Sequence, residues 1–185
     1  MEEIYTSDNV KSRLILAGLK ELDQHGVVDF SLRRVAIGAG VSCAAPYRHF
    51  KDKDELISSI ISYVMEGWGI LSAQISELFE GNPEGLIAEL ATAGLRFWIA
   101  NGNFRTVIMN SDRISSNGGV MSDFERPIIS AVAAISSDCN PKELEFKVLS
   151  ALYGAISLVD GGRYSADEAA QILKKTVLDI FDQNG

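Results

Sequence analysis

Basic side chains are concentrated between residues 30 and 53, in a chain that is acidic overall. This stretch carries five basic residues and one acid, Asp52, so its local balance is +4, whereas the whole chain has a net charge of −8. The five are Arg33, Arg34, Arg48, Lys51 and Lys53. Guanidinium and ammonium groups at this density can bind phosphate. Such binding depends on the electrostatic field at the contacting surface and not on the total charge of the chain. The pattern therefore favours one small anion-binding segment over a surface that coats a polyanion.

Residues 31–50, SLRRVAIGAGVSCAAPYRHF, predict two short helices that a tight turn joins, over 32–38 and 43–49. Gly40 suits a backbone that must leave one helix and begin another within about four residues. Ser42 is placed to cap the second helix, whose first side chains are small. Small side chains would let the start of that helix lie deep in a major groove. The segment therefore indicates a helix-turn-helix.

Residues 13–56 resemble the DNA-binding domain of the TetR (tetracycline-repressor-like) family of regulators. The residues that carry this likeness are Gly26, Ser31, Ala36, Ala39-Gly40-Val41-Ser42, Tyr47-Arg48-His49-Phe50, Lys53 and Leu56. The resemblance implies an all-α fold of about nine helices. A three-helix DNA-binding domain over 1–52 would precede an effector-binding and dimerisation domain over 53–185. The implied function is a ligand-responsive transcriptional regulator, a homodimer on a palindromic double-stranded operator, with repression the commoner outcome.

The resemblance also implies which side chains contact DNA. Tyr47, His49 and Lys53 are expected on phosphates, and Arg48 is expected near phosphate. Arg33 is expected on a phosphate or a guanine edge, whereas Arg34 is expected to be a solvated charge. The small side chains that follow Ser42 would read thymine methyl groups and groove shape. The expected contact set is Arg33, Ser42, Cys43, Ala44, Ala45, Tyr47, Arg48, His49 and Lys53.

Pro46 departs from the family pattern, which often has leucine there. If Ser42 caps the second helix, the proline removes the first regular backbone hydrogen bond of that helix. Either the helix begins later than residue 43, or a short helix tolerates the loss. The pose of the residues between Ser42 and Pro46 depends on which alternative holds.

Helical periodicity and cap residues continue through the rest of the sequence, with no convincing strand. Asn82 and Asn140 each precede a proline, as an N-cap does before a first helical residue. Ser165 and Glu168 have the spacing of a capping box. The remaining expected helices span 8–24, 53–80, 84–100, 103–111, 122–138, 141–159 and 166–182.

Two sets of side chains suggest what residues 53–185 do. Apolar stripes on the last two helices would pair with a second copy, through Leu149, Leu152, Ile156, Val159, Leu173, Val177 and Ile180. A second set would line a pocket for an apolar or amphipathic effector, and comprises Trp68, Phe97, Trp98, Phe104, Arg105, Met109, Phe124 and Tyr153. For both sets the alternative is that the side chains form the core of one protomer.

Other classes of function lack the residues that they require. Cys43 and Cys139 are far apart and have no histidine at ligand spacing, so neither a zinc site nor a disulfide is expected. No cofactor is expected, and without a Glu-x-x-His pair, a GxSxG elbow or a phosphate loop, neither is an enzyme. No stretch is expected to span a membrane, and a cytoplasmic location follows. The alternative function is a helical ligand-binding or adaptor protein that no longer binds DNA, which Pro46 and the weakly basic head would favour.

Overall fold

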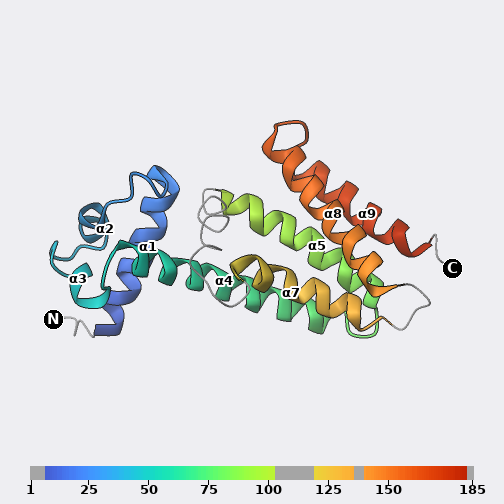
Figure 1. Ribbon diagram of the computed structural model, residues 1–185, viewed down its shortest axis with the longest axis horizontal. Coiled ribbons are helices and arrows are strands. Elements are labelled where there is room, and N and C mark those ends of the chain that lie inside the picture. The colour runs from blue at the N-terminus through green and yellow to red at the C-terminus, as the bar shows by residue number, and fades with distance from the viewer. Residues whose placement is uncertain (1–6, 103–118, 136–139, 183–185) are drawn as a thin grey trace. The chain divides into compact units, whose positions relative to one another are not determined.

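The computed structural model describes residues 7–102, 119–135 and 140–182, and the regular structure in these ranges is helical throughout (Figure 1). Its helices are α1 (Ser7–His25), α2 (Leu32–Gly38), α3 (Pro46–His49), α4 (Lys53–Leu78), α5 (Pro83–Ala100), α7 (Gly119–Ala133), α8 (Pro141–Asp160) and α9 (Ala166–Asp182). The all-α fold is therefore confirmed. The helix expected over 103–111 lies outside the described residues.

The chain forms two compact units, and the division between them falls inside α4, after Glu66. The first unit contains α1, α2, α3 and the beginning of α4, and the second contains the remaining helices. The boundary expected after residue 52 was drawn between two expected functions, whereas the two packed units divide after Glu66. That functional boundary stays a prediction.

The first unit is built on α1, which packs against both α2 and α3. Leu14 and Leu22 of α1 are fully buried, together with Val35 and Ala36 of α2. Gly18 lets α1 pass close to α4, because a Cβ atom at this position would lie 2.6 Å from Cδ1 of Ile60. The apolar face of one helix thus positions both short helices.

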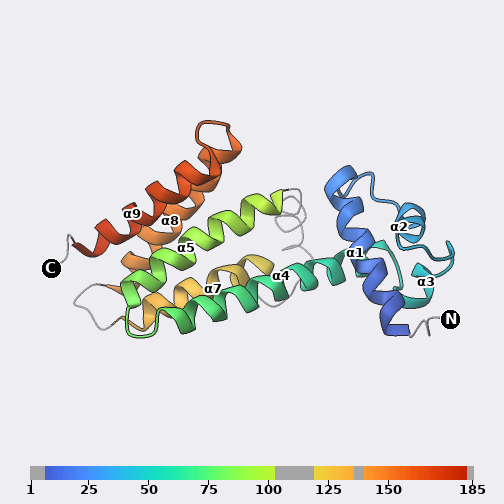
Figure 2. The same ribbon diagram turned by 180° about the vertical axis from the view of Figure 1, so that it is seen from behind.

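The second unit is built around α5, which packs against α7, α8 and α9. Figures 1 and 2 show α5 running between α7 and the α8–α9 pair. Ile87, Ala88, Leu90, Ala91 and Leu95 are all fully buried, although they point in different directions around the helix. A helix that is apolar on most of its surface must be surrounded by other elements.

An aromatic cluster joins α4, α5 and α7 within the second unit. The ring of Phe124 lies 5.0 Å from the rings of Trp68 and Trp98 and 6.2 Å from that of Phe97, measured between centroids. The indole N–H of Trp68 donates to the backbone oxygen of Phe124 at 3.0 Å. Phe124 is therefore the centre of this cluster, and it is completely buried.

The helix ends follow the cap residues seen in the sequence. Asn82 accepts a hydrogen bond from the Gly85 amide at 2.9 Å and so caps α5. Ser165 Oγ accepts from the Glu168 amide at 3.2 Å, while Glu168 accepts from the Ser165 amide at 3.0 Å. This reciprocal pair is the expected capping box, and α9 has the bounds that it predicted. By contrast, α7 is Gly119–Ala133 rather than 122–138.

Helix α4 is long and apolar enough to cross a membrane, by length and composition alone. The sequence reading had expected no such segment. However, Leu56, Ile60 and Trp68 of this helix are buried within the two units. A core helix of a soluble protein passes the same test, so the finding carries little weight for a membrane protein.

The aromatic cluster yields a prediction about stability. Replacing Phe124 with alanine should lower the free energy of unfolding by about 3–5 kcal/mol, because a buried ring is lost and a cavity remains. Leu78→Ala is the matched control, since Leu78 of α4 is 81% exposed and should change stability by less than about 0.5 kcal/mol. Chemical denaturation at one fixed protein concentration compares the two variants. Equal effects would mean that the cluster does not hold α7 in place.

Candidate nucleic-acid interface

The turn between α2 and α3 is closed by two backbone hydrogen bonds. The Val41 amide donates to the Ala36 oxygen and the Gly40 amide to the Ile37 oxygen, each at 3.0 Å. This pair of bonds defines a Schellman motif, which needs a left-handed residue just after the helix. Gly40 fills that position with φ +66°. The glycine that the sequence suggested for the turn is therefore required by its backbone conformation.

Helix α3 begins later than the sequence reading placed it. Residues 42–45 form a turn in which the Ala45 amide donates to the Ser42 oxygen at 2.9 Å. The helix itself is Pro46–His49, and Pro46 is its first residue. A proline costs no hydrogen bond there, because the first amides of a helix have no partner within it. The span 43–49 was therefore wrong, and the later start holds.

Most of the expected contact residues lie on the surface of this segment. Arg33 of α2, Ser42, Cys43 and Ala44 of the turn, and Tyr47 and Arg48 of α3 are exposed. The side chain of Tyr47 is 64% exposed, so it is not a core residue. His49 is half-buried, and its ring centroid lies 6.4 Å from that of Phe50. The exposed set includes two arginines and a phenol, which suits a phosphate backbone.

Ala45 does not lie on that surface. It is the N-cap of α3 and is buried, like Pro46 beside it. The late start of the helix turns this methyl group inward, so Ala45 does not fit the base contact expected of it. Cys43 and Ala44 remain as the small exposed side chains of the turn.

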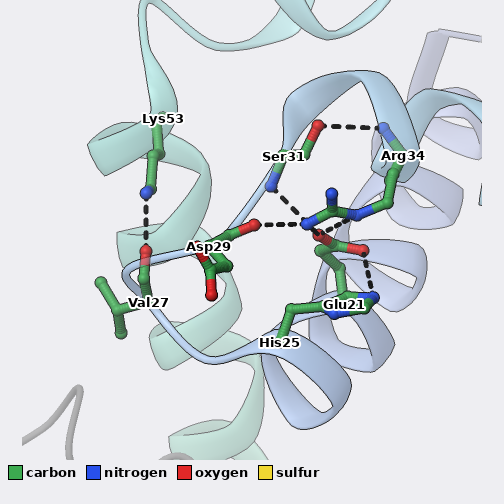
Figure 3. A network of polar contacts seen from close by, with 7 residues as sticks. All are labelled: Glu21, His25, Val27, Asp29, Ser31, Arg34 and Lys53. Atoms are coloured by element: carbon green, nitrogen blue, oxygen red, sulfur yellow. Dashed lines mark hydrogen bonds and ion pairs between the residues drawn. The ribbon is translucent and has the colours of Figure 1, made fainter.

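Lys53, at the start of α4, already has a partner inside the protein. Its Nζ donates to the backbone oxygen of Val27 at 2.6 Å (Figure 3). The same Nζ lies 5.7 Å from the ring centroid of Phe30. An ammonium has three N–H donors, so this bond leaves donors for a phosphate. The phosphate contact of Lys53 stays a prediction, and the side chain also holds the loop between α1 and α2.

The start of α4 is fixed by side-chain hydrogen bonds. Asp52 Oδ1 accepts from the Glu55 amide at 2.9 Å, and Glu55 accepts from the Lys51 amide at 2.5 Å. Asp52 therefore caps the beginning of α4. This arrangement keeps Lys51 and Lys53 at a fixed helix start beside α3.

Arg34 is exposed, as expected of a solvated charge, but it also pairs with a buried carboxylate, which the sequence reading did not foresee. Its Nε donates to Glu21 Oε1 at 2.7 Å, and its Nη2 forms an ion pair with the same oxygen at 2.5 Å (Figure 3). Glu21 is 6% exposed and also accepts from the Ser31 amide at 3.1 Å. The signal was present in the sequence, because Glu21 lies seven residues after Leu14 and so shares the buried face of α1.

The electrostatics of Glu21 follow from these contacts. Burial alone would raise the pKa of its carboxyl group. The hydrogen bonds from Arg34 and Ser31 and the positive charge of Arg34 outweigh burial, and the pKa lies below its usual value. Glu21 is thus a carboxylate held by its partners.

The expected pocket residues are only partly brought together. Trp68, Phe97, Trp98 and Phe124 form the aromatic cluster of the second unit, where their rings pack on one another. The indole N–H of Trp98 has no hydrogen-bond partner among the described residues. Phe104, Arg105 and Met109 lie outside the described residues.

Tyr153 stands apart from the aromatic cluster. Its hydroxyl group donates to Glu125 Oε1 at 2.5 Å. Burial, together with this carboxylate, raises the pKa of the phenol. Tyr153 therefore stays neutral and ties α8 to α7.

The expected dimer residues do not share one surface. Leu152, Ile156, Leu173 and Val177 are buried in the core of the protomer, while Leu149, Val159 and Ile180 are half-buried. The stripe of α8 and α9 was read correctly as apolar, but its partners are mainly α5 and the neighbouring helix. The other face of these helices carries a groove of about 240 Å³, with Ala151, Gly154, Leu158, Tyr164 and Ile172 along it.

Comparisons with known proteins agree with this geometry. Residues 14–60 match the family model for bacterial regulatory proteins of the tetR family. The HTH-type transcriptional regulator AcrR of Shigella flexneri is 31% identical over 84 residues, which are 45% of this chain and 39% of that protein. The chain thus spans about two fifths of the length of this curated relative.

Solved structures resemble the fold over nearly the whole chain. One protein of Mesorhizobium loti, assigned to the TetR family, has a TM-score of 0.76 at 17% identity and covers 97% of this chain and 98% of its own. The multidrug binding protein EbrR, solved with ethidium, has a TM-score of 0.65 at 20% identity and covers 90% and 97%. At these identities the likeness establishes the fold.

The turn yields a prediction. Gly40→Ala should destabilise the first unit by about 1–2 kcal/mol, because a left-handed residue with a Cβ atom is strained. The new Cβ would also lie 2.8 Å from Nη2 of Arg13. Gly69→Ala is the control, since a Cβ there meets nothing within 4 Å and alanine favours the helix. Thermal denaturation should show a loss for the first variant and none for the second.

Proposed function

We propose that this chain, which belongs to the TetR family of bacterial regulatory proteins, is a dimeric transcriptional regulator that a small molecule releases from DNA. The observation that carries the proposal is the segment from Arg33 to Arg48. In this segment a Schellman turn lies beside small exposed side chains and beside Arg33 and Arg48, which are exposed and make no hydrogen bond or ion pair with the described residues. Phosphates would meet Arg33, Tyr47 and Arg48, and the groove would receive Cys43 and Ala44.

The alternative, an adaptor that no longer binds DNA, has lost one of its two supports. It rested on Pro46 as a disruption of the second helix, but Pro46 is the first residue of α3, where it fits. The weakly basic head remains, and local charge at the contacting face matters more than the total. The double variant Tyr47→Ala with Lys53→Ala separates the two functions, since an adaptor would keep its cellular activity.

The dimer that we propose uses the free face of α8 and α9 in place of the buried stripe. Leu158 and Ile172 are 37% and 54% exposed beside the groove, and Gly154 has open space next to its Cα atom. Small and apolar side chains permit two such faces to approach closely. A two-fold interface would then pair α8 and α9 with their copies in a four-helix bundle.

The effector is proposed to bind in the second unit, beside the aromatic cluster. Several rings, and the indole of Trp98 that has no hydrogen-bond partner within the described part of the chain, suit an apolar or amphipathic molecule. The ethidium complex of EbrR supports this class of ligand by analogy of fold. The dimer would release DNA if effector binding favoured a different distance between its two DNA-binding units. That distance would no longer match successive major grooves, which are about 34–36 Å apart.

DNA binding is tested by its dependence on salt. A duplex selected from a random pool with the wild-type protein serves as the probe. Arg33→Ala and Arg48→Ala should each weaken binding and lower the slope of log K against log salt by about 0.9, since each removes one phosphate contact. Arg126→Ala is the control, because Arg126 of α7 is exposed and pairs with Asp123. A wild-type protein that selects no sequence from the pool, at any salt, would contradict the proposal.

The proposed interface on α8 and α9 is tested by the oligomeric state of two variants of the protein. Ile172→Glu should weaken the dimer at least tenfold, because a two-fold axis brings the new carboxylate near its copy. Leu78→Glu places the same charge on the far more exposed Leu78 of α4 and should leave the dimer unchanged. Sedimentation equilibrium measures both dissociation constants. A dimer of unchanged affinity in Ile172→Glu would remove α9 from the interface.

A further inference from the structure

Glu21 of α1 and Arg34 of α2 form the centre of a polar network in the first unit (Figure 3). Oε1 of Glu21 accepts from the Arg34 side chain and from the Ser31 amide. The guanidinium of Arg34 continues to the backbone oxygen of Asp29. His25 completes the surroundings, with Nε2 3.8 Å from the second oxygen of Glu21. A single buried carboxylate thus joins α1, the following loop and α2.

The contacts of this network converge on the beginning of α2. Ser31 is the N-cap of that helix, and its hydroxyl accepts from the Arg34 amide at 3.4 Å. The Ser31 amide is in turn bound to Glu21, so the cap residue is held from both sides. A helix of seven residues is too short to be stable alone. Its direction therefore depends on contacts such as these.

Two adjacent arginines on α2 have different surroundings. Arg33 is exposed and makes no hydrogen bond or ion pair with the residues that the structure describes. Arg34 commits its Nε and Nη2 to Glu21 and Asp29. A guanidinium bound in this way is not available to clamp a phosphate in the bidentate manner. Arg33 is therefore free to contact DNA, whereas Arg34 is placed to position α2.

We infer that Glu21 and Arg34 are positioning residues, which fix α2 on α1 and so orient the exposed surface from Arg33 to Arg48 without touching DNA. The inference rests on the proposed function for its DNA readout. It assigns Arg34 a role opposite to that of Arg33, although both are arginines on the same short helix. Lys53 binds the same loop at Val27, so α4 is also tied to the beginning of α2.

The first experiment measures exchange of the Ser31 amide by NMR, with no DNA present. Glu21→Leu removes the acceptor and should speed this exchange about tenfold or more, the change expected when a hydrogen bond to a charged group is lost. Glu21→Gln keeps an oxygen in place and should give a smaller change. Amides within α1, such as that of Gly18, report whether the whole unit has opened. Ser31 exchange that is unchanged in Glu21→Leu would overturn the inference.

The second experiment compares Arg34→Ala with Arg33→Ala on the selected duplex. Both should weaken binding, but Arg34→Ala should leave the salt slope at the wild-type value, because no phosphate contact is lost. Arg34→Lys should recover only part of the affinity, since an ammonium cannot copy the fork that joins Glu21 to Asp29. A slope that falls by about 0.9 in Arg34→Ala would make Arg34 a phosphate contact and overturn the inference.

The acid dependence of stability provides a further check. The pKa of Glu21 lies below its usual value in the folded unit, so the stabilisation by its carboxylate is present above the ordinary glutamate pKa and is lost as the pH falls through the folded pKa. The difference in stability between wild type and Glu21→Gln should therefore shrink in acid. The failure of the proposed function and the failure of this inference are distinguishable. If the wild-type protein selects no duplex, the proposed function fails, but the exchange rate of the Ser31 amide still shows whether Glu21 positions α2.

Discussion

Both ends of α2 are held by side chains of α1. Glu21 binds the cap residue Ser31 at the beginning of α2, and Arg13 donates to the backbone oxygen of Ala39 at its end. The charges have the signs that suit a helix dipole, with the acid at the amino end and the arginine at the carboxyl end. Because α2 and α3 are too short to be stable alone, the exposed surface from Arg33 to Arg48 depends on these contacts with α1. The apolar contacts of Val35 and Ala36 complete the attachment.

The features that could be predicted from the sequence are those with local causes. The capping box of Ser165 and Glu168 and the glycine of the turn each act within a few residues, and both were identified. The bounds of α9 followed for the same reason. The start of α3 was misplaced because Ser42 is also a residue type that caps helices. Only the turn over residues 42–45 shows that the helix begins at Pro46.

The features that sequence reasoning missed depend on long-range pairing. Arg34 looked solvated because its partner Glu21 is thirteen residues away on another helix. The stripe of α8 was recognised as apolar, but periodicity does not say which element covers it. Leu152 and Ile156 face the core of the protomer, so the surface that we propose for a second copy is the one that passes Gly154 and Leu158. The amphipathic pattern of a helix identifies its buried face but does not identify the element that covers that face.

The chain has two tryptophans, and both lie in the aromatic cluster of the second unit. The first unit contains none, so tryptophan emission originates entirely in the other unit, whereas tyrosines such as Tyr47 lie in the first. The two indoles are also chemically distinct, since Trp68 donates to a backbone oxygen and Trp98 has no partner among the described residues. Tryptophan fluorescence, excited at a wavelength that tyrosine does not absorb, is thus an optical probe of the second unit alone.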